Sequence, residues 1–176
     1  SYECEGCAVY VNATENGSNA IDFGAMNITV KGDWFNDSIV DSGTTTIDFT
    51  TESTFNYTTH ITGAGAHSLN NVIISGTLVA PSTLNILGNW TNNGTFNHNS
   101  GTITFTGTGN ISGSMITTFN DLYLTTTGSI ALTSETICIA GDYSLSTTGT
   151  FNQGSNNINL SGDMTIAAGV YYISSG

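Results

Sequence analysis

Short runs in which apolar and polar residues alternate recur along the whole chain. Clear examples are Leu84-Asn-Ile86, Ile103-Thr-Phe105 and Leu122-Tyr-Leu124, and Gly or Asn follows almost every such run. A period of two buries one face of a β-strand, and no window has the apolar stripe of an amphipathic helix. The three runs begin 19 residues apart, which is about the length of one coil in a parallel β-solenoid. The pattern therefore predicts an all-β fold, a parallel β-solenoid (β-helix).

A longer period of about 55 residues is superimposed on these runs. Its clearest motif is an apolar-x-apolar run followed by Gly, Asp or Asn, and an aromatic residue. The three copies are Ile28-Thr-Val30-Lys-Gly32-Asp-Trp34, Leu84-Asn-Ile86-Leu-Gly88-Asn-Trp90 and Ile137-Cys-Ile139-Ala-Gly141-Asp-Tyr143, with their central glycines 56 and 53 residues apart. We expect a single domain, residues 1–176, with repeats at about 28–83, 84–136 and 137–176 and a partial repeat or junction segment at 1–27.

The two periods together predict how the coils stack. Three coils of about 18 residues fill one repeat, so the chain holds about nine coils in a stack about 40–45 Å tall. Equivalent apolar residues are expected to stack on one another: Val30, Ile86 and Ile139, and likewise Phe49, Phe105 and Leu160. Asn and Thr suit the stacked polar positions, because like charges about 5 Å apart would repel. The rival fold is a β-sandwich with an N-terminal donor strand.

The segments at the two ends of the chain correspond to consecutive positions of the repeat. Val9-Tyr-Val11 resembles Leu122-Tyr-Leu124, and Tyr171-Tyr-Ile173 stands just before the next such strand. No polar cap is evident, although open solenoid ends pair readily with further strands. Two interpretations follow: copies stack head to tail into a homopolymer, or the sequence is an excerpt of a longer repeat protein. The predicted junction residues are Val9, Tyr10, Val11, Tyr171, Tyr172 and Ile173.

The acidic net charge of the chain argues against some classes of binding partner. Charged residues make up 8% of the chain, and Lys31 is the only Lys or Arg against 13 Asp and Glu, which gives a formal net charge of −12. Nucleic acid and anionic membrane surfaces attract Lys and Arg, so neither is expected as a partner. No apolar run approaches the roughly 20 residues of a membrane span.

Several features favour an extracellular or cell-surface location. No signal peptide is visible, so we expect that it was cleaved or lies outside this sequence. Nine Asn-X-Ser/Thr sequons are present, and we interpret them as sites for covalent N-glycans. They are Asn12, Asn16, Asn27, Asn36, Asn56, Asn89, Asn93, Asn110 and Asn159.

The three cysteines are Cys4, Cys7 and Cys138. Cys4-x-x-Cys7 lacks the second pair or His cluster of a zinc site, so a disulfide is the better interpretation in a secreted protein. One N-terminal cysteine could bridge to Cys138, which is expected on the outer face of a strand, within or between subunits. A local Cys4–Cys7 bond is the alternative.

No catalytic constellation is apparent, and we do not expect an enzyme. Lys31 is the only base available for polysaccharide-lyase chemistry, and the histidines His60, His67 and His98 are expected at surface or turn positions. Asp33 and Asp142, with Asn89 between them in the repeat series, suit a shared turn role. No cofactor is expected; scattered carboxylates binding structural calcium is the one weak exception that we consider.

Three quoted segments carry a resemblance to a known class of proteins: GNWTNNGTFNHNSGTITFTG, ISGSMITTFNDLYL and IAGDYSLSTTGTFNQGSNNINLSG. They resemble repeat segments of large secreted prokaryotic surface proteins, adhesins and extracellular filament subunits. The resemblance implies a β-solenoid with a structural or adhesive role. We therefore expect a glycosylated filament subunit; a stalk or glycan-binding adhesin module, with Trp34, Trp90 and Tyr143 contacting sugars, is the alternative. Residues 1–11 could also act as an inserted donor strand.

Overall fold

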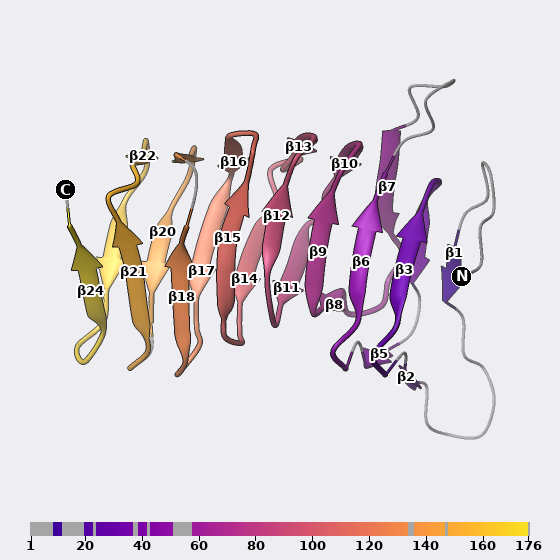
Figure 1. Ribbon diagram of the computed structural model, residues 1–176, viewed down its shortest axis with the longest axis horizontal. Coiled ribbons are helices and arrows are strands. Elements are labelled where there is room, and N and C mark those ends of the chain that lie inside the picture. Colours follow the sequence, from indigo (N-terminus) through magenta and orange to yellow (C-terminus); the bar gives the residue numbers. More distant parts are fainter. Residues whose placement is uncertain are drawn as a thin grey trace.

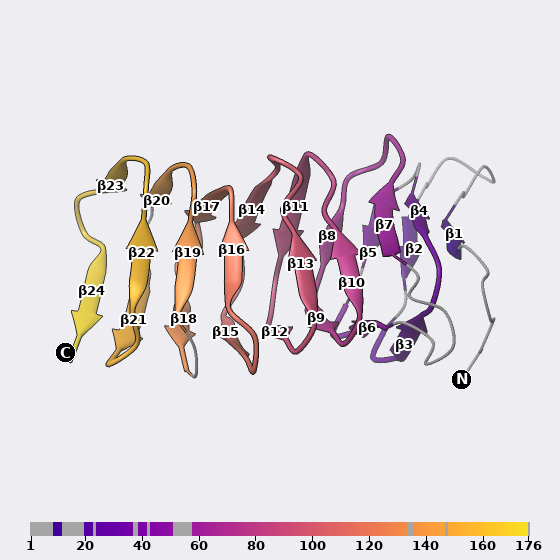
Figure 2. The same cartoon turned by 90° about the horizontal axis from the view of Figure 1, so that it is seen from above.

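The fold is a parallel β-solenoid that coils around one long axis (Figures 1 and 2). A computed structural model describes residues 9–11, 20–22, 24–36, 39–41, 43–50, 58–133, 136–146 and 148–175, and these contain strands and no helix. Every strand pairing between the described residues is parallel, and partners are one coil apart in sequence, as in Trp90 opposite Ile111. The solenoid prediction is confirmed, and the β-sandwich is excluded for this part of the chain.

Each coil contributes one strand to each of three faces. On the first face, β1 (Val9–Val11), β4 (Trp34–Asn36), β7 (Thr58–Thr62), β10 (Thr77–Val79) and β13 (Thr95–Asn97) form one sheet, and β16 (Thr117–Phe119), β19 (Ile137–Ile139) and β22 (Ile158–Leu160) continue it. On the second face, β2 (Ala20–Asp22) pairs with β5 (Ile39–Asp41), and the sheet continues with β8 (Ser68–Leu69), β11 (Thr83–Ile86), β14 (Thr102–Phe105), β17 (Asp121–Leu124), β20 (Tyr143–Leu145) and β23 (Met164–Ile166).

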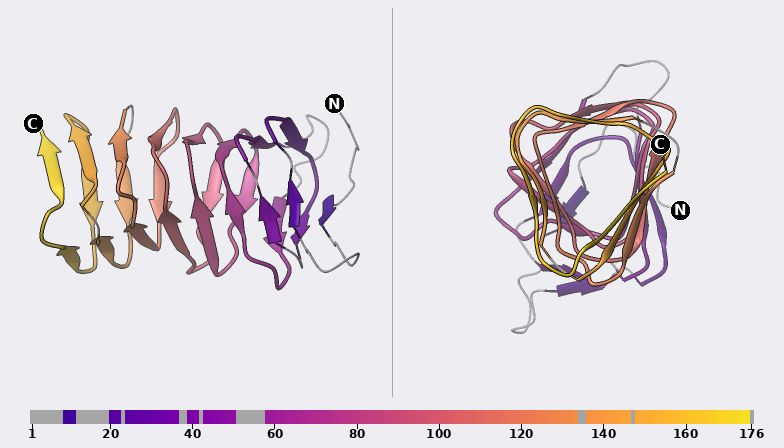
Figure 3. Two further views of the ribbon diagram at one scale, coloured as in Figure 1. Left: turned by 90° about the horizontal axis from the view of Figure 1, so that it is seen from below. Right: turned by 90° about the vertical axis from the view of Figure 1, so that its left-hand side faces the viewer.

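The third face is the longest continuous sheet, with eight strands. These are β3 (Asn27–Val30), β6 (Thr46–Phe49), β9 (Asn71–Ile74), β12 (Trp90–Asn92), β15 (Gly109–Gly113), β18 (Ser129–Leu132), β21 (Thr150–Gly154) and β24 (Tyr171–Ser174). The described residues therefore make eight coils, slightly fewer than the nine expected. Seen end-on, the coils superimpose as one closed outline (Figure 3).

The core lies inside this outline and is built by the alternation seen in the sequence. Along β11 and β14, Leu84, Ile86, Ile103 and Phe105 are fully buried, while the residues between them face outward. Parallel pairing stacks Ile86, Phe105 and Leu124 in one column through three successive coils. The pattern of apolar residues along each strand thus fixes which face points inward.

The 55-residue repeat does not coincide with a whole number of coils. Val30 lies in β3 on the third face, Ile86 in β11 on the second and Ile139 in β19 on the first. The prediction that these equivalent residues stack on one another is therefore wrong, and so is the prediction for Phe49, Phe105 and Leu160, which lie in β6, β14 and β22. Val30 instead stacks on Phe49, and Ile139 stacks on Leu160.

The reason is that one repeat contains eight strands, whereas one coil contains three. Eight strands make two and two-thirds coils, so each repeat begins one face away from the repeat before it. Other equivalent segments obey the same count: β7 and β15, β13 and β21, and β9 and β17 are all eight strands apart. The described strands number 24, which is both three repeats and eight coils.

Candidate functional site

The C-terminal end of the solenoid is an open coil, where inward-facing apolar side chains are exposed at the end of the core. Met164, Ile166 and Tyr172 are 44%, 47% and 36% exposed. Their strand partners one coil earlier, Tyr143, Leu145 and Phe151, are at most 2% exposed. The difference arises because a following coil covers each inner partner, whereas no described residue covers β22, β23 or β24 on their outer side.

The predicted junction residues lie at opposite ends of the molecule (Figure 1). Tyr171, Tyr172 and Ile173 form β24 and are all exposed. Val9–Val11 forms β1, an edge strand whose only described partner is β4. The two groups cannot meet within one chain, so the contact predicted between them requires a second copy.

The aromatic residues considered for sugar contact are buried. Trp34, Trp90 and Tyr143 are 0%, 0% and 1% exposed. Trp90 packs edge-on against Phe96, with ring centroids 4.8 Å apart, and Tyr143 packs in the same way against Phe151. Burial raises the pKa of the Tyr143 hydroxyl well above its usual range. These residues cannot form a sugar-binding surface, and the expectation that they contact glycans is wrong.

The Asp and Asn residues of the repeat motif share one structural contact. Asp33 Oδ1 accepts the backbone N–H of His60 at 2.9 Å, Asn89 Oδ1 accepts that of Asn110 at 2.9 Å, and Asp142 Oδ1 accepts that of Asp163 at 3.1 Å. In each case the donor lies on the following coil, so the side chain joins two coils at a corner. The expected turn role of these residues is confirmed.

These contacts extend into columns along the corners. On one corner Asn89 N–H donates to Asn71 Oδ1 at 2.9 Å, so Asn71, Asn89 and Asn110 form a ladder. On another corner Asp142 N–H donates to Asp121 Oδ1 at 2.9 Å, which places Asp121, Asp142 and Asp163 in a corresponding ladder. The expectation that only uncharged residues stack is therefore wrong here. Each of the two inner carboxylates accepts a backbone N–H, which offsets part of the repulsion between neighbours.

Five of the predicted glycosylation sites lie at exposed positions. These are Asn27, Asn89, Asn93, Asn110 and Asn159. Asn89 and Asn93 use Oδ1 as an acceptor, the latter for both the N–H and the hydroxyl of Ser114. An N-glycan is attached through Nδ2, so these side chains can carry sugar and keep their bonds between coils.

Asn36 differs from the other sequons because it is buried. It is 1% exposed, and its Nδ2 donates to the Ala66 carbonyl at 2.9 Å. A sugar on this nitrogen would have no space and would remove that bond, so the prediction of a glycan at Asn36 is wrong for the folded chain. Asn12, Asn16 and Asn56 lie outside the described residues.

Cys138 lies several coils away from β1, the described strand that follows Cys4 and Cys7 in the sequence. Cys138 lies half-buried on the outer side of β19, as predicted, and forms no disulfide with a described residue. Six strand spacings, about 29 Å, separate β19 from β1. Cys4 and Cys7 lie outside the described residues, but the five residues from Cys4 to Val9 span at most about 18 Å. A bridge to Cys138 within one chain is therefore excluded, and a bridge between chains or a Cys4–Cys7 bond stays a prediction.

His60 and His67 line the same open depression, His98 does not, and one of the three, His67, is not at the surface. His60 Nδ1 lies 3.0 Å from Asp33 Oδ1 in a half-exposed pair, and His98 Nδ1 accepts the N–H of Ser100. His67 is 7% exposed, and burial lowers the pKa of its imidazole. Among the described residues no three His, Cys, Asp or Glu side chains gather to hold a metal ion, and the calcium expectation remains untested.

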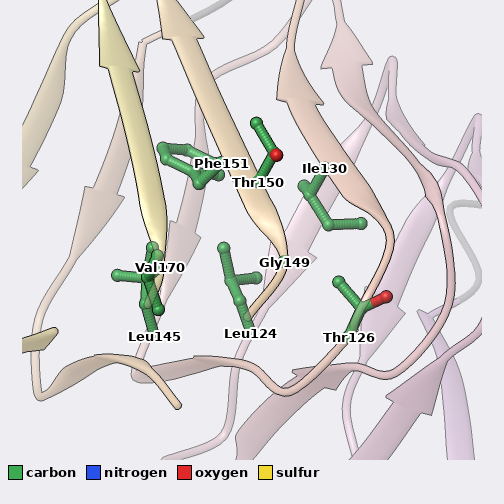
Figure 4. A pocket seen from close by; sticks show the side chains of 8 residues that line it. All are labelled: Leu124, Thr126, Ile130, Leu145, Gly149, Thr150, Phe151 and Val170. Atoms are coloured by element: carbon green, nitrogen blue, oxygen red, sulfur yellow. The ribbon is translucent and has the colours of Figure 1, made fainter. Parts of the chain in front are cut away.

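Two hollows stand out among the described residues. Figure 4 shows side chains that line a small hollow, among them Leu124, Leu145, Phe151 and Val170. Its volume is about 10 Å³, the space of a single water molecule. The larger hollow, about 430 Å³, is an open polar depression at the corner after β7, beside Pro81 and Asn99. Its described lining includes two imidazoles, those of His60 and His67, and no Asp, Glu, Lys or Arg.

Comparisons with family models, with curated proteins and with solved structures give no match. None of the described segments is a helix with the length and hydropathy of a membrane span. The open C-terminal coil is therefore the candidate functional surface that the structure itself supplies.

Proposed function

We propose that this chain is a structural subunit of an extracellular, glycosylated filament. Copies polymerise head to tail, and each copy continues the β-solenoid of the copy before it. The observation that carries this proposal is the open coil at the C-terminal end, where Met164, Ile166 and Tyr172 expose apolar surface that is buried in every inner coil. Unpaired parallel edges also recruit further strands, because their backbone N–H and C=O groups have no partner.

The strand count supports a second copy as the occupant of this end. The repeat at 137–176 holds six strands, β19 to β24, and β1 and β2 in the partial segment 1–27 have the positions of a seventh and an eighth strand. β24 also lies on the third face, so the next strand belongs on the first face, where β1 lies. The coil and the repeat are thus both in phase across a junction between two copies.

The glycan part of the proposal is supported by the position of the sequons. Asn89, Asn93 and Asn110 lie at exposed positions, where sugar would extend into solvent. Charged residues make up 8% of the chain, and covalent sugar would add polar surface to it. The polymer needs no catalytic residue, so we propose a non-enzymatic role.

A concentration series of the full chain tests polymerisation, followed by light scattering and negative-stain microscopy. We expect filaments whose amount rises with concentration. Ile166→Glu places a charge in the axial apolar surface and should abolish them, whereas Thr165→Glu, on the opposite side of the same strand, should leave them intact. A wild-type chain that stays monomeric at high concentration refutes the proposal.

A further inference from the structure

The repeat fixes which residues meet when two copies join, given the head-to-tail filament proposed above. β22 is the third member of the series β6, β14 and β22, and β1 is the first member of the series β1, β9 and β17. Two internal pairings, β6 with β9 and β14 with β17, therefore serve as templates for a pairing of β22 with β1 of the next copy.

The two templates have the same register. Between β6 and β9, Ile47 lies opposite Val72 and Phe49 opposite Ile74. Between β14 and β17, Ile103 lies opposite Leu122 and Phe105 opposite Leu124. All eight of these side chains are buried, at most 4% exposed. The register is therefore a property of the repeat and not of one coil.

We infer that β22 of one copy pairs in parallel with β1 of the next, with Ile158 opposite Val9 and Leu160 opposite Val11. Ile158 and Leu160 occupy the positions of Ile103 and Phe105, but they are only half-buried in the single chain. The docking strand would complete their burial, as it does in both templates.

The third face gives a second, independent register. Tyr172 occupies the position of Phe119: it packs against Phe151 with centroids 5.6 Å apart, as Phe119 packs against Phe96 at 6.0 Å. Phe119 pairs with Ile139, whose counterpart in the first repeat is Val30. Strand β24 therefore pairs with β3 of the next copy, with the Tyr172 backbone opposite that of Val30.

The side-chain alternation makes this register specific. A shift of the docking strand by one residue would put its alternation out of phase with that of β22, so that Val9 and Val11 no longer lie opposite Ile158 and Leu160, and this is strongly disfavoured. β22 and β1 both lie on the first face, so their pairing needs no change of face at the junction. Eight coils at about 4.8 Å give an axial rise of about 38 Å per copy.

Cysteine cross-linking between two single-cysteine variants tests the register in filaments. The native cysteines are first replaced, as Cys4→Ser, Cys7→Ser and Cys138→Ser, and folding is checked by circular dichroism. Asn159 is opposite Tyr10 in the inferred pairing, so mixed Asn159→Cys and Tyr10→Cys chains should give a cross-linked dimer upon oxidation. Asn157→Cys, two residues earlier on the same side, is the matched control and should cross-link to Tyr10→Cys at least several-fold less.

The outcomes separate this inference from the proposed function. Preferential linking at Asn159, with an axial rise near 38 Å in filament images, supports the register. Filaments that link preferentially at Asn157, or at neither position, overturn the register and leave the filament intact. The absence of filaments overturns the proposed function, and the register is overturned with it.

Discussion

Asparagine has two structural roles in this protein, and they depend on which end of the amide is used. Buried Asn36 and Asn92 donate through Nδ2 to the carbonyls of Ala66 and Ile116, which hold the corner loop of the following coil. Exposed Asn89 and Asn93 instead accept through Oδ1 and leave Nδ2 at the surface. The Nδ2 of a sequon asparagine is therefore buried in a hydrogen bond at one corner and exposed at another.

Peptide mass mapping of native protein tests this difference. We expect glycans on exposed sequons such as Asn89, Asn93 and Asn110, and an unmodified peptide at Asn36, because its Nδ2 is bonded inside the fold. Asn27, which is exposed and lies nine residues before Asn36, is the internal control. A glycan found at Asn36 would contradict the buried position.

His67 should make stability depend on pH. It occupies the position of Thr117, whose Oγ1 lies 3.4 Å from Trp90 Nε1, and its pKa is lowered because burial disfavours the charged imidazole. A lowered pKa means that the unfolded chain binds more protons below pH 6.5. The stability is therefore full above that pH and falls as the pH drops toward the folded-state pKa, by up to about 1.4 kcal/mol per pH unit.

Urea unfolding of wild type and His67→Thr between pH 7.5 and about 5 measures this contribution. The variant carries the residue that the second repeat uses at this position, so it should fold and should lose less stability on acidification. The other titrating groups are common to both chains and cancel in the difference. Parallel stability curves for the two proteins would show that His67 does not titrate in this way.

At the scale of the element, the corner ladders add hydrogen bonds between neighbouring coils to the hydrophobic contacts of the core. Each step joins a side-chain oxygen to the backbone N–H of the next coil, so neighbouring coils are tied outside their strands as well as within them. In the ladder of Asp121, Asp142 and Asp163, this bond is made despite adjacent negative charges. The middle repeat has Asn89 at the position of Asp142 and makes the same bond without charge.

Substitution of Asp142 separates the hydrogen bond from the charge. Asp142→Asn keeps an acceptor for the Asp163 N–H and removes repulsion, so stability should be unchanged or higher by a few tenths of a kcal/mol at low salt. Asp142→Ala also removes the repulsion but loses the acceptor, at a cost of about 1 kcal/mol. Urea midpoints at low and high salt measure both, and a less stable Asn variant would contradict this account of the ladder.

At the scale of the whole molecule, the dominant feature is a repeat of eight strands wound on a coil of three. Equivalent residues of successive repeats are distributed over the three faces, so they do not stack on one another. Nine of the 13 acidic residues lie within the first 52 residues, and the net charge of −12 averages about one negative charge per 3 Å over the length of the filament. Such a surface repels neighbouring filaments.

Lateral association of filaments should therefore depend on cations. At about 10 mM salt the Debye length is near 30 Å and filaments should stay apart, whereas at 0.15 M it is near 8 Å and bundles can form. Calcium should bundle them more than sodium at equal ionic strength, because it can bridge carboxylates. Low-speed sedimentation and microscopy measure this; sedimentation that does not change with salt would contradict the role assigned to charge.

Much of this architecture could be predicted from alternation and spacing. Runs such as Ile103-Thr-Phe105 identify strands and their inner face, and their spacing of 19 residues gives the coil. The buried His67 and Asn36 could not be found in this way, because their surroundings depend on the corner that follows. The only sign of the acidic ladder in the sequence is the 21-residue spacing of Asp121 and Asp142, which is one coil in that part of the chain.

The sequence by itself determines the strands, the parallel coil and the repeat, because these follow from side-chain alternation and from spacing along the chain. Only the tertiary structure decides which strands of the repeats stack on one another. Partners along the third face are 18 residues apart at Val72 and Trp90 but 21 at Trp90 and Ile111. The corners differ in length while the strands keep their pairing. One repeat therefore contains eight strands and not the nine of three whole coils. This one-strand difference moves every equivalent residue to another face.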